Sequence, residues 1–143
     1  MILTRKRQKL TSQGLNNATG ILSAVQTVTT LPDGYTARNT CSQIHLTASG
    51  TLLYVANRVH NSIAGFAVDV RTGHLTPIGH VATEAVPSAF SLDPAGSFLF
   101  AAGTVSGQLA SYRISAETGL LTPLATQAVG QRPTAVLTTR LGD

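Results

Sequence analysis

Charged and aromatic side chains are scarce in this chain of 143 residues. Asp, Glu, Lys and Arg make up 11% of it, aromatic residues make up 5%, and tryptophan is absent. Because 43% of the residues are nevertheless apolar, the composition excludes an intrinsically disordered chain. No apolar run approaches the roughly 20 residues that a membrane-spanning helix needs. The sequence therefore predicts one ordinary domain with no membrane partner.

Cysteine is almost absent as well. Cys41 is the only thiol, which excludes an internal disulfide framework and most cysteine-based zinc sites. The four histidines lack the paired spacing of a zinc site, and there is neither a phosphate-cradling glycine motif nor a nucleophile elbow. We therefore expect no metal and no cofactor, and the lone cysteine is compatible with a cytoplasmic protein.

Positive charge is concentrated at the start of the chain. Arg5, Lys6, Arg7 and Lys9 are four of the ten basic residues, and residues 10–143 carry six basic and six acidic groups. The folded part therefore has no excess charge with which to attract nucleic acid. The start also lacks the apolar core of a secretory signal. We interpret residues 1–17 as a disordered, solvated terminus, with a nucleic-acid arm or a targeting peptide as alternatives.

What the sequence does contain is an internal repeat. Residues 42–87 and 88–133 are adjacent copies of a 46-residue unit in which fourteen paired positions are identical. Each copy consists of short runs of β-branched, aromatic and other apolar residues separated by glycine-containing turns. A strand-rich repeat of this length is typical of a β-propeller blade, which cannot bury its apolar faces alone.

Each copy is expected to form four strands. The predicted strands are 42–47, 51–57, 62–69 and 74–82, then 88–93, 97–102, 107–114 and 120–128, with an outer strand at 20–29 and a final inner strand at 133–138. The fold class is therefore all-β, a partial propeller of about two and a half antiparallel blades over residues 18–143. Because closed propellers have four to eight blades, we expect faces containing Leu53, Val55, Ile63 and Phe66 to need missing blades or self-association to cover them.

Six segments together resemble a known family: 42–50, 53–58, 60–63 and 69–75 in the first copy, and 90–96 and 98–103 in the second. They are similar to the seven-bladed propeller lactonases, the 6-phosphogluconolactonase and muconate-cycloisomerase-like proteins. The resemblance covers about residues 18–138 and corresponds to the C-terminal third of such proteins. It departs from the family at Gln43, where glutamate is usual. Residues 54–57 alone would equally suggest a YVTN-type binding propeller.

Strand order predicts where candidate site residues gather. The loop before the first strand and the loop between the second and third strands lie at the same end of each blade. That end is expected to hold Arg38, Cys41, Ser42, Asn57, Arg58 and His60, then Glu84, Ser88 and Thr104, and finally Arg132.

Arg58 is the main candidate. Its fixed charge and planar fork suit a carboxylate, a phosphate or the developing oxyanion of a lactone carbonyl. The resemblance implies that it matches an Asn-Arg motif whose arginine lies in the active-site cleft. The alternative is a structural arginine that bonds loop carbonyls. The second copy has Thr104 at this position, so the repeat itself does not require arginine.

The other candidates each have a structural alternative. His60 is a candidate general base or a surface loop residue, and His45 is a substrate-binding candidate or a buried core histidine. Asn57 is grouped with the substrate-binding residues. Arg38 and Arg132 are candidates for a phosphate group or are solvated loop residues. Glu84 is a further acid or base candidate, and Cys41 has no base near it in sequence.

Two functions remain open at this point. The resemblance implies the C-terminal part of a lactonase of the pentose phosphate pathway, which would hydrolyse a sugar-acid lactone with water as the nucleophile. It also implies that the family's catalytic His and Glu lie in blades that have no match here, so we expect the chain alone to be inactive. The alternative is a non-catalytic propeller piece that binds a partner or another copy.

Overall fold

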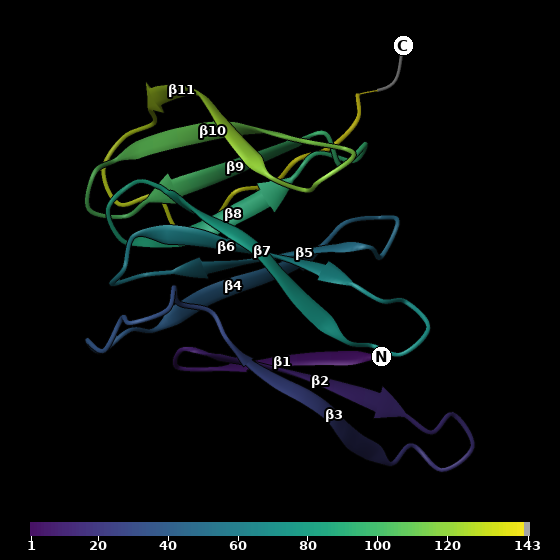
Figure 1. Cartoon of the computed structure of the whole chain (residues 1–143). Helices are drawn as coiled ribbons and strands as arrows, with labels where there is room; N and C mark the ends of the chain where they lie inside the picture. The colour runs from purple at the N-terminus through teal and green to yellow at the C-terminus, as the bar shows by residue number, and fades with distance from the viewer. Residues whose placement is uncertain (142–143) are drawn as a thin grey trace.

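The chain forms three antiparallel sheets stacked face to face, in a computed structural model that describes residues 1–141 (Figure 1). No helix among these residues has the length and apolarity to cross a bilayer. The first sheet contains β1 (Ile2–Lys6), β2 (Lys9–Leu15) and β3 (Leu22–Thr29). The second contains β4 (Cys41–Leu46), β5 (Leu52–Asn57), β6 (Ser62–Val68) and β7 (Leu75–Ala82). The third contains β8 (Pro87–Leu92), β9 (Phe98–Gly103), β10 (Gln108–Ile114) and β11 (Leu121–Ala128).

The repeated sequence gives repeated turns. Gly50 lies in the turn between β4 and β5, and Gly96 lies in the equivalent turn between β8 and β9. Both have positive φ, at 75° and 71°. At that angle any side chain would strain the backbone, which is why glycine stands there in both copies. The partial propeller predicted from the 46-residue repeat is confirmed for these two sheets, strand by strand.

Two apolar layers hold the stack together. The layer between the first and second sheets includes Leu10, Leu53 and Phe66, and the layer between the second and third includes Tyr54 and Phe90, all fully buried. Alternate side chains of β5 therefore enter opposite layers, because successive residues of a strand point to opposite faces. The second sheet is covered on both sides.

This arrangement corrects one expectation. Leu53, Val55, Ile63 and Phe66 were expected to be left uncovered in an open arc, yet all four have no exposed surface. The cause is the first sheet, which covers the face that carries Leu53, Val55 and Phe66, while the third sheet covers Ile63. The uncovered faces of this chain are the outer faces of the first and third sheets.

Residues 1–17 are also different from the prediction, because they form β1 and β2 rather than a disordered terminus. Leu3 and Leu10 face the second sheet and pack into its apolar layer. The basic side chains of this segment lie at neighbouring positions and stay at the surface, so Lys6, Arg7 and Lys9 are all exposed. The sequence analysis missed the alternation of buried and exposed positions in these strands because residues 5–9 carry four charges.

The first sheet is a blade that lacks its innermost strand. Its β2–β3 pair is interrupted by a register shift between Ser12 and Gln13, and the β6–β7 and β10–β11 pairs have the same shift. The pairing also repeats at matched positions: Lys9–Thr29 and Leu15–Leu22 correspond to Ser62–Ala82 and Val68–Leu75. β1 therefore corresponds to β5, the second strand of a blade, and β4 has no counterpart in this sheet.

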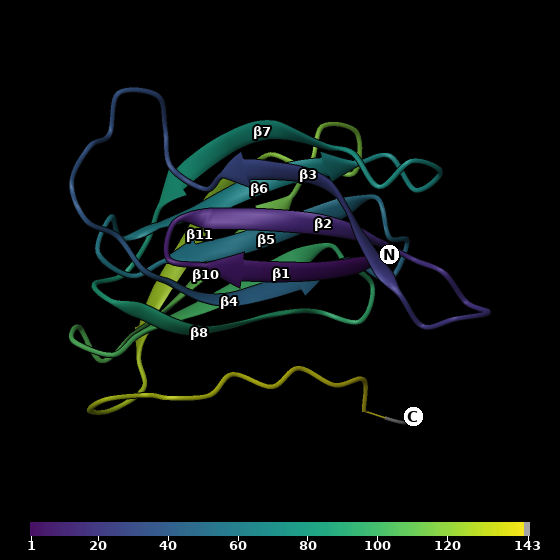
Figure 2. The ribbon, with the colours of Figure 1, turned by 90° about the horizontal axis from the view of Figure 1, so that it is seen from below.

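The predicted strand at 133–138 does not form. The segment runs beside the third sheet (Figure 2), but none of its residues is assigned to a strand. A strand needs a hydrogen-bonded neighbour in its sheet, and within residues 1–141 nothing occupies that position.

Gly119, in the turn between β10 and β11, lies close against the second sheet. It has φ of 73°, and an added Cβ would lie 2.5 Å from Leu52 Cδ2. Gly20 occupies the equivalent turn of the first sheet, with φ of 71° and no atom within 4 Å of the added Cβ. We expect both alanine variants to carry the same backbone strain, and Gly119→Ala to lose about 1–3 kcal/mol more of the free energy of unfolding than Gly20→Ala. Urea denaturation measures this difference, and equal losses would contradict tight packing between the second and third sheets.

Candidate functional site

The candidate residues lie at the end of the stack where β1 runs into β2, on the left in Figure 1. The loops at this end are residues 7–8, 30–40, 58–61, 83–86 and 104–107. Each of them either joins the second and third strands of a blade or leads from one blade to the next. The predicted gathering of loops at one end is therefore confirmed.

Asn57 fixes the position of these loops. It is fully buried, and its Oδ1 accepts hydrogen bonds from Thr30 Oγ1 and Asn39 Nδ2, both at 2.8 Å. Its Nδ2 donates to Thr30 O at 2.7 Å and to Ser62 Oγ at 3.2 Å. Both amide atoms of Asn57 are engaged in this way and the side chain is fully buried, so the structure places it in the framework of the loops.

Asn39 continues the same network. Its Oδ1 accepts the backbone N–H groups of Val59 and His60, at 3.1 and 3.2 Å. Asn39 is itself buried. The two asparagines thus tie the 58–61 loop to the long 30–40 loop, and the backbone around Arg58 is held from both sides. Sequence analysis did not single out Asn39 or Thr30, because nothing in a loop sequence marks a buried amide pair.

Arg58 lies at the outside of this rigid network. Its backbone N–H donates to Thr40 O at 2.8 Å, whereas its guanidinium is exposed and makes no hydrogen bond with any residue that the structure describes. A fixed backbone with an unengaged guanidinium is the arrangement expected of an anion-binding arginine. Among residues 1–141 the side chain does not take the alternative role of bonding loop carbonyls.

The third sheet uses its equivalent position differently. Thr104 replaces Arg58 there, and its Oγ1 is hydrogen-bonded to Ser88 Oγ and donates to Pro133 O at 3.3 Å. Thr104 therefore ties its loop to the next segment of the chain and presents no charge. The two copies share a framework, and at this position the second sheet carries an arginine whose guanidinium has no hydrogen-bond partner among residues 1–141.

His60 is close to Arg58 but is packed into the loops. Its ring lies edge-to-face against Tyr35, with centroids 4.7 Å apart, and its Nδ1 is 2.7 Å from Ser62 Oγ. Ser62 Oγ already accepts a hydrogen bond from Asn57, so its own hydrogen is available to His60 Nδ1. When Ser62 donates that hydrogen to Nδ1, Nε2 carries the ring hydrogen and is a donor, whereas in the other tautomer Nδ1–H donates to Ser62 Oγ and Nε2 is a free acceptor.

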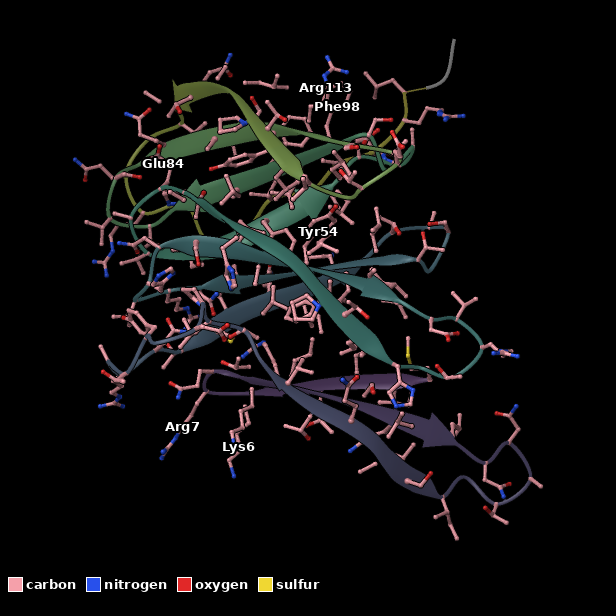
Figure 3. The ribbon with its side chains drawn as sticks, in the orientation of Figure 1. Lys6, Arg7, Tyr54, Glu84, Phe98 and Arg113 are labelled. Carbon is pink, nitrogen blue, oxygen red and sulfur yellow. The ribbon has the colours of Figure 1, made fainter. Side chains whose placement is uncertain are left out.

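A basic cleft lies beside the first sheet. It is open, has a volume of about 940 Å³, and is lined by Lys6, Arg7, Lys9 and Arg38, together with threonines of β2 and β3. Figure 3 shows Lys6 and Arg7 pointing away from the second sheet, on the outer side of the stack. This places Arg38 among three cations that sequence analysis assigned to a solvated terminus. The position of Arg7 in its blade could have indicated this, because Arg7 directly follows β1 just as Arg58 directly follows β5.

The remaining candidates lie elsewhere. His45 is four residues along β4 from Cys41, or about 13 Å, and its half-buried ring lies edge-to-face on Phe90 at 4.6 Å. Burial lowers the pKa of this imidazole. Arg132 is exposed and lines a separate open hollow with Thr104. The structure therefore does not bring His45 or Arg132 together with Arg58.

Two further candidates are also accounted for by packing. Cys41 is buried, its Sγ lies 3.3 Å from Thr30 Oγ1, and burial raises the pKa of the thiol, so it is poorly suited to be a nucleophile. Glu84, which is labelled in Figure 3, is half-buried. It lines a third hollow together with Tyr112. Neither is near the Arg58 side chain in any cavity that the structure describes.

Comparison with known proteins gives a consistent family. Residues 7–138 match the family model described as lactonase, seven-bladed β-propeller. The 6-phosphogluconolactonase of Bacillus subtilis is 35% identical over 94 residues, which is 65% of this chain and 27% of that protein. The enzyme of the same name from Pectobacterium carotovorum is 39% identical over 79 residues, or 55% of this chain and 24% of that protein. The chain thus spans about a quarter of the length of these curated relatives.

Solved structures give the same picture. A protein from Lactobacillus plantarum superimposes with a TM-score of 0.84 and 31% identity, over 90% of this chain and 38% of its own. The periplasmic gluconolactonase of Pseudomonas aeruginosa superimposes with a TM-score of 0.80 and 26% identity, over 87% of this chain and 35% of its own. The three sheets therefore superimpose on a little more than a third of each of these two chains.

The buried asparagine network gives a test of its own. Asn57→Ala would leave Thr30, Asn39 and Ser62 without their partner, and we expect it to lower the free energy of unfolding by about 2–4 kcal/mol. Asn17→Ala is the matched control, because Asn17 is exposed in a turn and its loss is expected to change stability by less than about 0.5 kcal/mol. Denaturant unfolding of both variants measures the effects. A change of less than about 1 kcal/mol in Asn57→Ala would show that the network does not hold the loops.

Proposed function

Because the chain belongs to the lactonase family of seven-bladed β-propellers, we propose that it forms part of a site that binds and hydrolyses a sugar-acid lactone. The observation that supports this most is Arg58, an exposed guanidinium on a backbone fixed by the buried Asn57 and Asn39 network. A cation that is held in place but not neutralised within the chain suits an anionic ligand.

The proposed chemistry assigns Arg58 to charge rather than to proton transfer. Water attacks the carbonyl carbon of the lactone, negative charge develops on the carbonyl oxygen, and the ring C–O bond then breaks to give the open-chain acid. The planar fork of Arg58 would stabilise that oxyanion or hold a carboxylate or phosphate of the substrate. His60, with its Nε2–H, would act beside it as a hydrogen-bond donor.

The basic cleft supports a phosphorylated substrate. Lys6, Arg7, Lys9 and Arg38 gather around one open space, and phosphate is the group that several converging cations recognise best. A lactone such as 6-phosphogluconolactone carries both groups, with its phosphate five carbons away from the carbonyl. Arg132 is proposed only as an additional cation at the same end of the stack.

A proton acceptor is what this assignment lacks. In this proposal His60 is assigned as a donor, and Glu84 lines a different hollow. We therefore propose that these 143 residues bind the ligand without turning it over, and that the water-activating base is supplied by other blades. Binding without turnover is also what the second candidate function, a non-catalytic propeller piece, requires.

Arg58→Ala tests the proposed role of the arginine. Calorimetric titration with 6-phosphogluconate, the open-chain product, should show binding that is weakened by about 10- to 100-fold, because a hydrogen bond to a charged group contributes about 1.5–3 kcal/mol. Arg71→Ala is the matched control, since Arg71 is an exposed arginine in the β6–β7 hairpin at the opposite end of the stack. It should bind like the unmodified chain.

Two results would contradict the proposal in different ways. Equal affinity in the Arg58→Ala and Arg71→Ala variants would remove Arg58 from the site. Hydrolysis of 6-phosphogluconolactone by the purified 143-residue chain, above the rate in the Arg58→Ala variant, would show that the chain contains its own base.

A further inference from the structure

The hollow that Glu84 lines, called the Glu84 hollow below, lies between the second and third sheets. It has a volume of about 490 Å³ and is enclosed by the end of β7, the 83–86 loop, β10 and β11. Ala110 and Tyr112 line it and belong to the apolar layer between these two sheets. Both sheets have all four strands in this chain. The hollow is therefore complete here, and its size is that of a small-molecule pocket.

Glu84 supplies the charge of this hollow. It is the one charged side chain among the lining residues within 1–141, and its half-buried carboxylate forms no hydrogen bond or ion pair with any of those residues. Burial raises the pKa of Tyr112, and the negative charge of Glu84 raises it further, so the carboxylate lies near that phenol. A carboxylate that is partly removed from water and has no partner favours a cation beside it.

The backbone that carries Glu84 is held in place. Asn61 holds the loop from one side, because its O accepts the N–H of Thr83 and its Oδ1 accepts the N–H of Val86, both at 2.9 Å. Gly103 lies against the loop from the other side, and a Cβ added there would lie 2.6 Å from Glu84 Cβ. Glycine at position 103 therefore leaves the room that Glu84 occupies.

The repeat shows that the fold does not require a carboxylate at this position. Glu84 stands 46 residues after Arg38 in the sequence. Two residues further along, Thr40 O and Val86 O each accept the equivalent backbone hydrogen bond, at 2.8 and 3.0 Å. The two loops therefore share a backbone frame but carry opposite charges, an anion in the Glu84 hollow and a cation in the basic cleft. A difference of this kind between two copies indicates recognition rather than folding.

The rest of the lining limits the kind of cation. One carboxylate supplies too few oxygen atoms for a divalent metal ion, which takes about six or more ligands, and residues 1–141 contain no group of three His, Cys, Asp or Glu that could hold one. Thr83 Oγ1 is buried and accepts no hydrogen bond from residues 1–141, so a hydrogen-bond donor is favoured here. Half of the lining residues are apolar, namely Ala82, Ala110, Pro123, Leu124 and Ala125.

We propose that the Glu84 hollow binds a small organic ammonium ion. The charged head of the ligand donates N–H hydrogen bonds to the Glu84 carboxylate, and its hydrocarbon stem lies against the apolar lining. Figure 3 shows Glu84 beside the third sheet, well separated from Lys6 and Arg7 of the basic cleft. The proposal therefore concerns a second site and does not depend on lactone binding.

The n-butylammonium ion is a suitable probe, with n-butanol as its uncharged counterpart. In an NMR titration of the 143-residue chain labelled with ¹⁵N, n-butylammonium should shift the amide signals of the hollow, in residues 82–86, 110–112 and 124–126, to saturation. At the same concentrations n-butanol should leave them unchanged. Glu84→Gln keeps the shape of the side chain and removes its charge, so it should weaken binding by about tenfold or more.

Two further variants separate this site from other charges of the chain. Glu117→Gln is the matched control, because Glu117 is exposed in the β10–β11 turn at the opposite end of the stack, and it should bind like the unmodified chain. Arg58→Ala should also bind n-butylammonium unchanged, whatever it does to lactone binding. Equal shifts with n-butanol in the unmodified chain, equal affinity of the Glu84→Gln and Glu117→Gln variants, or shifts confined to amides outside the hollow would each overturn the proposal.

Discussion

The structure depends on burial of the second sheet from both sides. β6 has the sequence SIAGFAV, and all but one of its residues are buried. A strand of this composition cannot lie at a surface, because both of its faces are apolar. The first and third sheets supply the two covers, and each apolar layer contributes stabilisation of the kind that a single blade cannot provide. Residues 1–29 therefore serve to cover one apolar face of the second sheet, although much of their own surface is polar.

The rigid end of the stack follows from this packing. Once the second sheet is fixed, the loops that leave it can be joined by buried polar groups, and Asn57 joins them with four hydrogen bonds. A buried amide that is fully satisfied defines one loop conformation, whereas an unsatisfied one would destabilise the fold. The backbone of Arg58 is held in place by these loops, while its guanidinium forms no hydrogen bond within residues 1–141. The second and third sheets share their strands and turns, and differ in that one presents a guanidinium and the other ties Thr104 to Ser88.

The repeat in the sequence predicted eight of the eleven strands closely, because two adjacent copies confirm each other at every turn glycine. It did not predict β1 and β2. These strands are separated by two residues, while the equivalent strands β5 and β6 are separated by four, so the 46-residue spacing does not extend to them. Their apolar core positions, Leu3 and Leu10, are separated by a segment with four charges. The candidate site was predicted in part: Arg58 lies where strand order places it, but no pattern in the sequence reveals that Asn57 is consumed by the fold, or that the basic residues near the start line a cleft with Arg38.

The central claim is that residues 1–29 form a blade that covers the second sheet. Hydrogen exchange of the intact chain, followed by mass spectrometry of its peptides, tests it directly, because exchange of hydrogen-bonded amides reports the free energy of local opening. The account predicts that amides of β2, which are paired on both sides, exchange far more slowly than those of an unstructured peptide and are protected together with those of β6. Exchange of residues 9–15 at the unstructured rate, while β6 stays protected, would contradict it.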